Sequence, residues 1–515
     1  MINIRYFRKP VLITKWSNWQ VAGLAKRQIT VLSQTTDTKD LRDFDLLPGP
    51  KLWPILGNLE HVKNGGKLSH EVQLAMARKY GPVCKDSLLG LRTVIISDPT
   101  IGEEIYRAEG KYPFRDFSYA LGEFFEERKN LGLQPSIIEL NGEEWAALRK
   151  MLSGPMMKPI NVKGFYPAFS SVALDAIDSI NTIKGQDGII QDFRESVLGK
   201  WSLETIGMFV YGMRMGLLDK DMTEVSHTFY EAIKVALVKS AYFSSNKMLK
   251  YLYRSDYKHL KASILNWYKS ANHYMEKFMD QVKRSQSSGE PLDPLISSSL
   301  MSYMMFKRNL DPNECATHAV EMFGAGYDTT SISITWILYW LGRNQDKQEI
   351  LLQELNEKVP DDCMLTDRII QKMPYLRACI KESARLTPLA FVSTRIFEED
   401  IVLQNYIVPA NTPLMISNYA MGRDEKIYPN ATTFLPERWL REKEDKSEIN
   451  PFATLPFGFG SRSCLGRRIA EAEMQAFTAL LIKRFRVEHI GEEQLGEIAL
   501  GLKPLEDTKF AFHDR

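Results

Sequence analysis

The stretch FGFGSRSCLG, residues 457–466, places one of the chain's five cysteines in a loop with three glycines and one arginine. Glycines permit backbone conformations and close approaches that a side chain would obstruct. A helix is expected to begin just after Cys464 and to continue through Arg484, which turns its first N–H groups toward the sulfur. That arrangement, with Arg462 nearby, favours the thiolate form of Cys464.

A lone thiolate in such a loop narrows the choice of metal. Zinc wants four ligands, and no second cysteine stands near Cys464 in the sequence. A metal that brings its other ligands with it fits better, and haem iron is such a metal. A buried structural cysteine is the alternative. The glycines and the arginine at these offsets argue against it.

A second segment, GAGYDTT at residues 324–330, combines two glycines with an acid and two hydroxyls. The helix that contains it is predicted to open at Asp311, with proline next, and to run to about Gly342, which is about 45 Å. Glycine inside a helix costs about 1 kcal/mol relative to alanine. Close packing of another helix is one explanation. We prefer the approach of a flat cofactor, with the proton-donating Asp328 and Thr329 beside it, because it also explains the polar residues.

The composition of the 515-residue chain is that of a folded protein, with 44% hydrophobic and 25% charged residues. No stretch reaches the ~20 apolar residues of a membrane-spanning helix. The odd cysteine count, without a Cys-x-x-Cys pair, argues against a disulfide framework and for a reducing compartment. Residues 1–36 carry six bases and no acid among apolar residues. We interpret them as a mitochondrial transit peptide, with a disordered basic tail as the alternative. The bases do not continue into the folded part, so nucleic-acid binding is not expected.

Residues 45–515 are expected to form one domain, since no long linker, repeat or low-complexity tract interrupts them. Helical patterns dominate, so the predicted fold class is mainly α with small β-sheets. The predicted helices span residues 67–80, 99–109, 142–152, 193–218, 257–286 and 373–386, and the predicted strands span 93–97 and 401–408.

Taken together, these segments resemble the cytochrome P-450 (haem-thiolate monooxygenase) superfamily. The loop 457–466 meets the pattern F-x-x-G-x-R-x-C-x-G, and residues 325–330 meet [AG]-G-x-[DE]-T-[TS]. The resemblance runs from Pro48 to the C-terminus and implies a single large fold with the long central helix over the haem. Three shorter patterns are also present, namely Trp145-x-x-x-Arg149, Glu382-x-x-Arg385 and Pro436-Glu-Arg438-Trp.

The resemblance implies a b-type haem (iron protoporphyrin IX) with Cys464 as the axial ligand of its iron. Asp328 and Thr329 would deliver protons on the other side of the haem. The residues implied to hold the haem are Trp145, Arg149, Arg395, Phe457, Arg462 and Gly466, and those implied to form a structural network beside it are Glu382, Arg385 and Arg438.

Four further bases resemble the mitochondrial branch of the superfamily. Arg467 and Arg468 follow the cysteine loop, and Arg377 and Lys381 lie in the helix predicted at 373–386. In that branch, bases at these positions dock a small acidic iron–sulfur ferredoxin of the adrenodoxin type. NADPH reduces that ferredoxin through ferredoxin reductase. The transit-like leader favours the same branch.

The implied activity is insertion of one atom of O2 into a lipophilic substrate, preferably sterol- or steroid-like. The implied location is the matrix side of the inner mitochondrial membrane, with peripheral attachment. The alternatives are a mitochondrial enzyme that oxidises xenobiotics and a microsomal enzyme fed by a flavoprotein reductase. A thiolate-haem isomerase or dehydratase and a non-enzymatic haem sensor are disfavoured, because neither needs Asp328 and Thr329.

Overall fold

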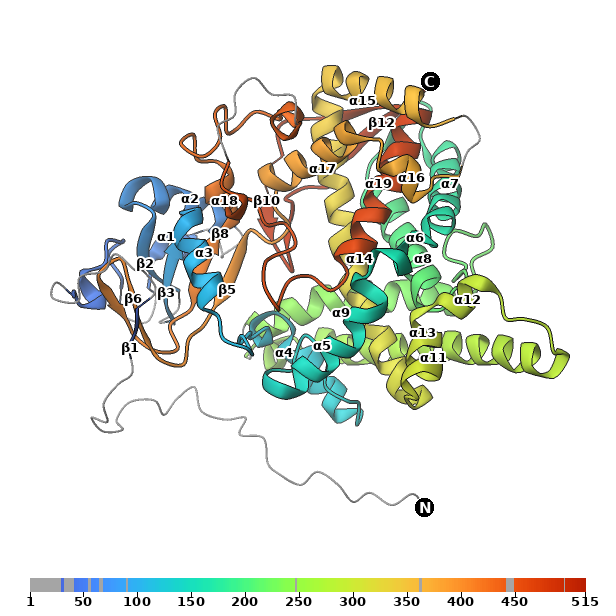
Figure 1. Cartoon of the computed structure of the whole chain (residues 1–515), viewed down its shortest axis with the longest axis horizontal. Coiled ribbons are helices and arrows are strands. Elements are labelled where there is room, and N and C mark those ends of the chain that lie inside the picture. The colour runs from blue at the N-terminus through green and yellow to red at the C-terminus, as the bar shows by residue number, and fades with distance from the viewer. Residues whose placement is uncertain are drawn as a thin grey trace, which may run out of the picture.

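Helices make up most of the structure, and short strands gather in small sheets, which confirms the predicted fold class. Two of the sheets lie at one end of the molecule, and helices pack at the other (Figure 1). The predicted transit peptide lies outside the described residues, apart from a three-residue strand. The computed structural model describes residues 29–31, 41–53, 57–63, 68–88, 91–245, 248–360, 364–440, 449–494 and 496–515.

The predicted helices are present, with bounds shifted by a few residues, except at the end of the run 193–218. That run begins with a π-helical turn, Arg194–Leu198, and its helix ends at Val210. The prediction beyond Val210 was wrong because Gly212 and Gly216 take positive φ angles of 74° and 77°, which a right-handed helix excludes. The helices are α1 Leu59–Lys63, α2 Ser69–Tyr80, α3 Pro99–Ala108, α4 Ser118–Asn130, α5 Gly142–Met157, α6 Pro159–Lys163, α7 Tyr166–Ile183, α8 Gly199–Val210, α9 Glu224–Ser245, α10 Leu249–Leu252, α11 Arg254–Ser288, α12 Pro294–Ser298, α13 Leu300–Ser302, α14 Pro312–Arg343, α15 Gln345–Lys358, α16 Asp367–Ile370, α17 Pro374–Leu386, α18 Asn418–Gly422 and α19 Arg467–Arg484.

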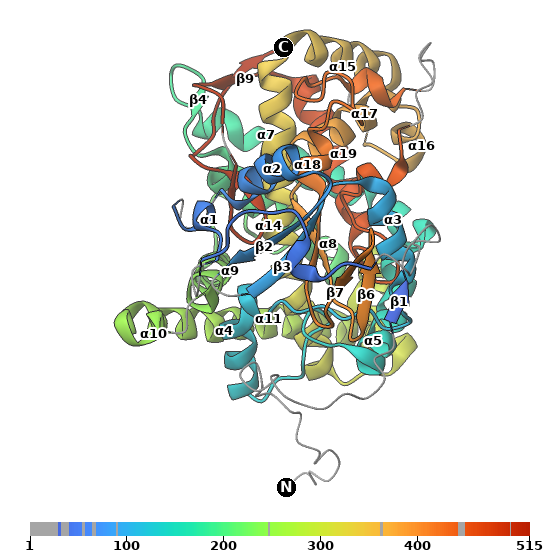
Figure 2. The ribbon, with the colours of Figure 1, turned by 90° about the vertical axis from the view of Figure 1, so that its left-hand side faces the viewer.

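The strand predicted at 401–408 is instead a hairpin of two strands. Gln404 and Asn405 take positive φ angles of 47° and 68°, which turn the chain back on itself. A four-stranded sheet with the order β2-β3-β8-β5 holds the strand that ends at Arg395 (Figure 1). Its strands β2 and β3 face the viewer in Figure 2. The strands are β1 Ile29–Val31, β2 Val83–Leu88, β3 Leu91–Ile96, β4 Ile189–Ile190, β5 Val392–Arg395, β6 Asp400–Leu403, β7 Tyr406–Val408, β8 Leu414–Ser417, β9 Phe485–Ile490, β10 Gly496–Ile498, β11 Leu502–Pro504 and β12 Lys509–Asp514.

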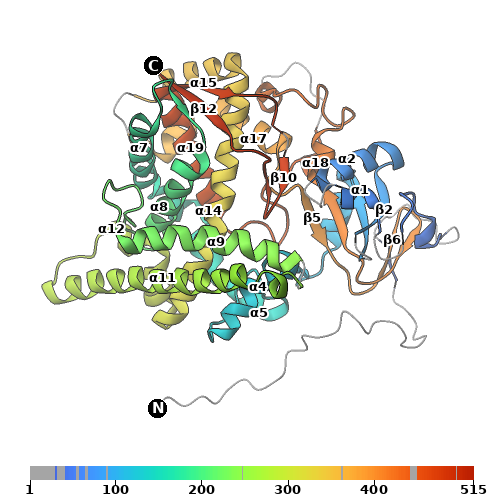
Figure 3. The same ribbon diagram turned by 180° about the vertical axis from the view of Figure 1, so that it is seen from behind.

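Helix α14 is the spine of the helical part, as predicted. The side chain of Asp311 accepts a hydrogen bond of 2.8 Å from the Asn313 N–H, and Pro312 occupies the first turn. The helix packs against α8, α11, α17 and α19. Behind it, α9 and α11 lie side by side (Figure 3). Contacts with these four helices fix both the position of α14 along its axis and its rotation about that axis.

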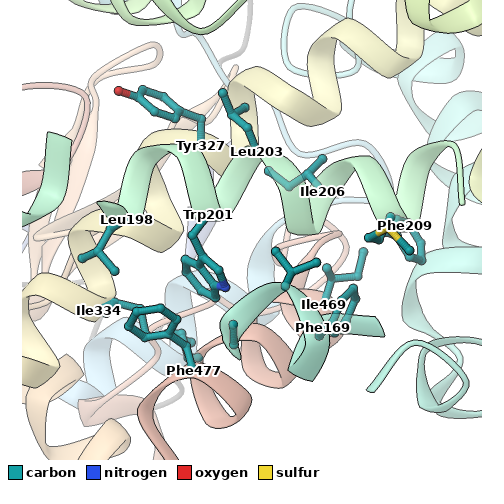
Figure 4. Packing of buried hydrophobic residues seen from close by; sticks show 14 of the residues in the cluster. Phe169, Leu198, Trp201, Leu203, Ile206, Phe209, Tyr327, Ile334, Ile469 and Phe477 are labelled. Atoms are coloured by element: carbon teal, nitrogen blue, oxygen red, sulfur yellow. The ribbon is translucent and has the colours of Figure 1, made fainter. Parts of the chain in front are cut away.

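The two glycines inside α14 serve helix packing, so the preferred explanation from the sequence was wrong for them. A Cβ at Gly324 would lie 2.5 Å from the ring of Trp267 on α11, and a Cβ at Gly326 would clash with Ile206 on α8. The residue between them, Ala325, is exposed. Figure 4 shows Ile206 in the buried cluster that joins α8 to its neighbours.

A buried carboxyl group links α14 to α19 beneath this cluster. Glu473 on α19 is 1% exposed, and one of its oxygens accepts a hydrogen bond of 3.3 Å from Thr330 on α14. Burial raises the pKa of Glu473 to about 8, although the bond from Thr330 lowers it. Glu473 is therefore a neutral acid at physiological pH.

We predict that Glu473→Gln stabilises the protein at alkaline pH. The folded protein keeps the proton of Glu473 up to about pH 8, whereas an unfolded chain releases it near pH 4.5. The native pKa is the higher one, so stability falls as pH rises between those values, by about 1.4 kcal/mol per unit for one such group. Denaturant unfolding should show the variant more stable than wild type by at least about 1 kcal/mol at pH 8 and similar at pH 5. Parallel pH profiles for the two proteins would contradict the assignment.

Candidate active site

The cysteine loop is a tight turn that leads into α19. The Cys464 N–H donates to the Phe457 carbonyl at 2.8 Å, and the Ser463 N–H donates to the Gly460 carbonyl at 3.1 Å. Gly460 has a φ of 75°, and any Cβ there would collide with the carboxylate of Glu109. Only glycine meets both conditions at position 460.

The thiol of Cys464 is accessible on one side, although protein surrounds the rest of it. Desolvation raises the pKa of Cys464. The Gly466 N–H, followed by Arg149, Arg115 and Arg467, lowers that pKa. The helix start therefore acts on the sulfur as expected.

The guanidinium of Arg462 binds oxygen atoms of two other segments of the chain. Its Nε donates to the Pro113 carbonyl at 2.8 Å, and Nη2 donates to Asn141 Oδ1 at 2.6 Å. Its guanidinium lies 3.8 Å from the ring centre of Trp145, the buried tryptophan of the short W-x-x-x-R pattern. Trp145, predicted from the sequence to hold a propionate, also supports Arg462 by this stacking.

Three more arginines surround this position. Arg115 donates to the Arg462 carbonyl at 3.3 Å, and Arg149 donates to Ser463 Oγ at 3.4 Å. Arg395, at the end of β5, is ion-paired with Glu109. We call Arg115, Arg149, Arg395 and Arg462 the arginine cluster. Arg115 was not among the predicted site residues.

The arginine cluster fits a dianionic cofactor. Burial, followed by repulsion from Arg115, Arg395 and Arg149, lowers the pKa of Arg462 to about 10, and Glu109 opposes this. The arginine cluster therefore carries more positive charge than Glu109 neutralises, and two propionates would offset part of the excess. With the accessible thiol beside it, this donor set fits a haem.

A buried ion pair connects α4 to the spine and so positions the loop below the arginine cluster. Arg128 and Glu321 have side chains 1% and 2% exposed and lie 2.8 Å apart. Glu321 also accepts a bond of 3.3 Å from the Ile137 N–H. Three residues further on, the Leu140 carbonyl accepts from Arg462. The segment that holds Arg462 is thereby tied to α14.

The accessible face of α14 carries one of the two predicted proton donors. Ala325 and Thr329 are exposed one turn apart, with Ser333 half-buried a turn further on. The Thr329 hydroxyl donates to the Ala325 carbonyl at 2.8 Å. The side chains on this face are small, and the two hydroxyls among them, those of Thr329 and Ser333, both donate to carbonyls of α14.

Asp328 is held by an arginine that the sequence did not reveal. Arg194 Nη1 lies 2.9 Å from Asp328 Oδ1, and Arg194 is also ion-paired with Glu195. Burial raises the pKa of Asp328, and Arg194 opposes the rise. Lys234 pairs with Glu195 at 2.9 Å and is 38% exposed, so charged groups connect Asp328 with the surface.

The structure brings Glu382, Arg385 and Arg438 together in a fully buried network. Glu382 accepts from Arg385 Nη2 at 2.7 Å and from Arg438 Nε at 2.9 Å. Its second oxygen accepts from Trp439 Nε1 at 2.8 Å. Every partner of Glu382 is a hydrogen-bond donor, as a buried carboxylate requires.

All four predicted docking bases are exposed, on the neighbouring helices α17 and α19. Arg467 and Arg468 share Glu471 as an ion-pair partner, at 2.9 and 3.4 Å. The ammonium group of Lys381 lies 3.9 Å from the ring centre of Trp439. Burial, followed by repulsion from Arg467, lowers the pKa of Lys381. The bases are close enough to repel one another.

Arg377 also makes a structural contact with α16. Its Nη1 donates to the carbonyls of Ile370 and Gln371 at 2.9 and 3.1 Å, which satisfies the end of α16. Reversing its charge would therefore disturb α16 as well as any docking. Arg468 is the cleaner position for a test. Its ion-pair partner Glu471 also pairs with Arg467, so Glu471 keeps one partner when Arg468 is replaced.

Known proteins similar to this chain cover most of its length. The chain matches the family model "Cytochrome P450" over residues 47–505. The mitochondrial 1,25-dihydroxyvitamin D(3) 24-hydroxylase of Mus musculus is 32% identical over 501 residues, which are 95% of this chain and 93% of that protein. The mitochondrial sterol 26-hydroxylase of Rattus norvegicus is 31% identical over 463 residues, or 88% and 85% of the two chains. Cytochrome P450 CYP12A2 of Musca domestica is 28% identical over 486 residues, or 90% and 89%. The chain belongs to the cytochrome P450 family of haem-thiolate monooxygenases.

Proposed function

We propose that the chain is a mitochondrial monooxygenase that binds haem b through Cys464 and inserts one atom of O2 into a sterol-like lipophile. It would act on the matrix side of the inner membrane, with electrons from NADPH through ferredoxin reductase and an adrenodoxin-like ferredoxin. The observation that carries the proposal is the accessible Cys464 thiol beside the arginine cluster. The printed names of the mouse and rat relatives support the location and the substrate class.

The residues divide the work between the two sides of the cofactor. A thiolate-ligated haem, when bound, supplies the activation of O2. The arginine cluster would hold its propionates by charge-assisted hydrogen bonds. Thr329 would hold and pass a proton at its hydroxyl, and Asp328 would replenish that proton. Burial raises the pKa of Asp328, and Arg194 opposes that rise.

The accessible face of α14 suits a lipophilic substrate. Met322 and Ala325 present apolar surface, and Thr329 is the hydroxyl among them. Because this face has few polar groups, an apolar ligand can bind there with little free-energy cost of desolvation. A sterol skeleton fits such a face better than a charged metabolite does.

Attachment to a membrane surface would use the tip formed by α9 and α10. Val238, Met248, Tyr251 and Leu252 are exposed there, at 66%, 67%, 67% and 71%. Among the described residues, no helix is long and apolar enough to cross a membrane. An exposed apolar patch of this kind is typical of a surface that enters a bilayer interface.

Reconstitution tests the proposal. The purified protein, with ferredoxin reductase and ferredoxin, should oxidise members of a sterol and secosteroid panel in the presence of NADPH and O2. Omitting ferredoxin should stop product formation. Product formed equally well without reduced ferredoxin would instead favour an isomerase or dehydratase, and product dependent on a flavoprotein reductase would favour a microsomal type.

The docking bases give a separate prediction. Arg468→Glu should weaken ferredoxin binding about tenfold or more at low salt and flatten the salt dependence of the dissociation constant, because electrostatic attraction between separated charges is screened by ions. Lys258→Glu, at an exposed base on α11, is the matched control. Helix α11 runs along the back of the molecule (Figure 3). Equal affinity and equal salt dependence for Arg468→Glu and wild type would refute this docking face.

A further inference from the structure

An isoleucine beside the docking bases is unusually exposed. Ile160 on α6 is 74% exposed, the highest value among the large apolar side chains of the described residues. Single exposed apolar residues are common on protein surfaces and by themselves mean little. Ile160 differs from such residues because it lies next to the docking bases.

Ion pairs and hydrogen bonds join α6 to the helix that carries Arg377. Lys163, one turn after Ile160, pairs with Asp367 at 2.7 Å, and Asp367 opens α16. The carbonyl of Ile370, the last residue of α16, accepts from Arg377. Ile160 thus lies at the edge of the surface that the docking bases occupy.

Helix packing gives the same placement. Helices α5 and α6 both pack against α19, which carries Arg467 and Arg468. Figure 1 shows α6, α16, α17 and α19 on one face of the molecule. Tyr166, three residues after α6, has a pKa raised mainly by burial. Arg468 and Arg377 lower that pKa, so both bases lie near it. Lys158, just before α6, is exposed as well.

Charge alone does not hold a small complex together. Exposed ion pairs add speed and orientation to association but contribute little affinity, about 0–1 kcal/mol each. In most interfaces a few desolvated apolar side chains, ringed by polar groups, supply the affinity. Ile160 between Lys158 and Lys163 has that arrangement.

We propose that Ile160 is the apolar anchor of the ferredoxin-docking surface, with Lys158 and Lys163 as its polar rim. The partner it fits is a small acidic ferredoxin that carries an apolar side chain beside its carboxylates. The inference rests on the proposed function and extends the docking face from α17 and α19 onto α6.

The test separates apolar from electrostatic contributions. Ile160→Ala removes three carbon groups and should weaken ferredoxin binding by about tenfold or more, as expected when burial of at least two of them is lost, and leave the salt dependence unchanged. The rate of the first electron transfer from limiting ferredoxin should fall in proportion. Reduction by dithionite should not change. Ile160→Leu should keep most of the affinity. Ile183→Ala on α7, where the side chain is 42% exposed, is the matched control.

The outcomes distinguish the two proposals. If Ile160→Ala binds ferredoxin as wild type does while Arg468→Glu loses affinity, the anchor is refuted and the docking face stands. If Ile160→Ala alters the salt dependence, the effect is not apolar and the anchor is again refuted. If wild type binds no ferredoxin and accepts electrons from a flavoprotein reductase, the proposed function fails and the anchor fails with it.

Discussion

Cys464→Ala is expected to abolish monooxygenase activity and the thiolate signature of the reduced carbon monoxide complex. No other described cysteine can take its place. Burial raises the pKa of both Cys84 and Cys315 to about 12, and Cys379 is fully buried with its pKa also raised. Of the described cysteines, only Cys464 is exposed. The variant keeps the arginine cluster, so some haem should still bind.

The measurement combines haem content with the spectrum of the reduced carbon monoxide complex. Cys464→Ala should retain part of the haem but show the band of a complex without a thiolate ligand. Cys315→Ser on α14 is the matched control, because it changes a buried cysteine in the same fold and should keep the thiolate band. A thiolate-type band in Cys464→Ala would end the assignment of this residue.

The three segments that carry the chemistry were predictable because their signals are local. The cap at Asp311 and the prolines beside α14 and α17 set helix starts that the structure places within one residue of the prediction. Helix α19 begins three residues after Cys464, at Arg467. Capping groups act over one turn, so the residues that determine where a helix begins are close together in the sequence.

Contacts between distant segments were not predictable. Arg194 and Asp328 are 134 residues apart, and no local pattern marks one as the partner of the other. Gly326 resembled a site for a cofactor, whereas its neighbour is Ile206 of α8. Arg462 stacks on Trp145, which is 317 residues away in the sequence, and no local pattern near Arg462 marks that partner. These contacts arise when helices far apart in sequence pack together.

Asp328→Asn is expected to lower the rate of product formation about 100-fold or more, in the range lost when a general acid–base group is removed. The amide keeps the shape of the side chain but cannot exchange a proton. Haem content should be unchanged, because Asp328 lies on α14 and outside the arginine cluster. Glu314→Gln, in the first turn of α14, is the control on the same helix and should keep the wild-type rate.

Arg194→Gln gives the diagnostic pH profile. Arg194 lowers the pKa of Asp328 against the effect of burial, so removing it should raise that pKa further. Asp328 would then stay protonated to higher pH. The pH at which it begins to exchange its proton should therefore move upward in Arg194→Gln. In Asp328→Asn that step of the profile should vanish. Initial rates at saturating ferredoxin, measured from pH 6 to 9, report both changes.

If Arg194→Gln leaves the pH profile of the rate unchanged, Arg194 supports the fold alone. If Asp328→Asn retains the wild-type rate, protons reach Thr329 by another route.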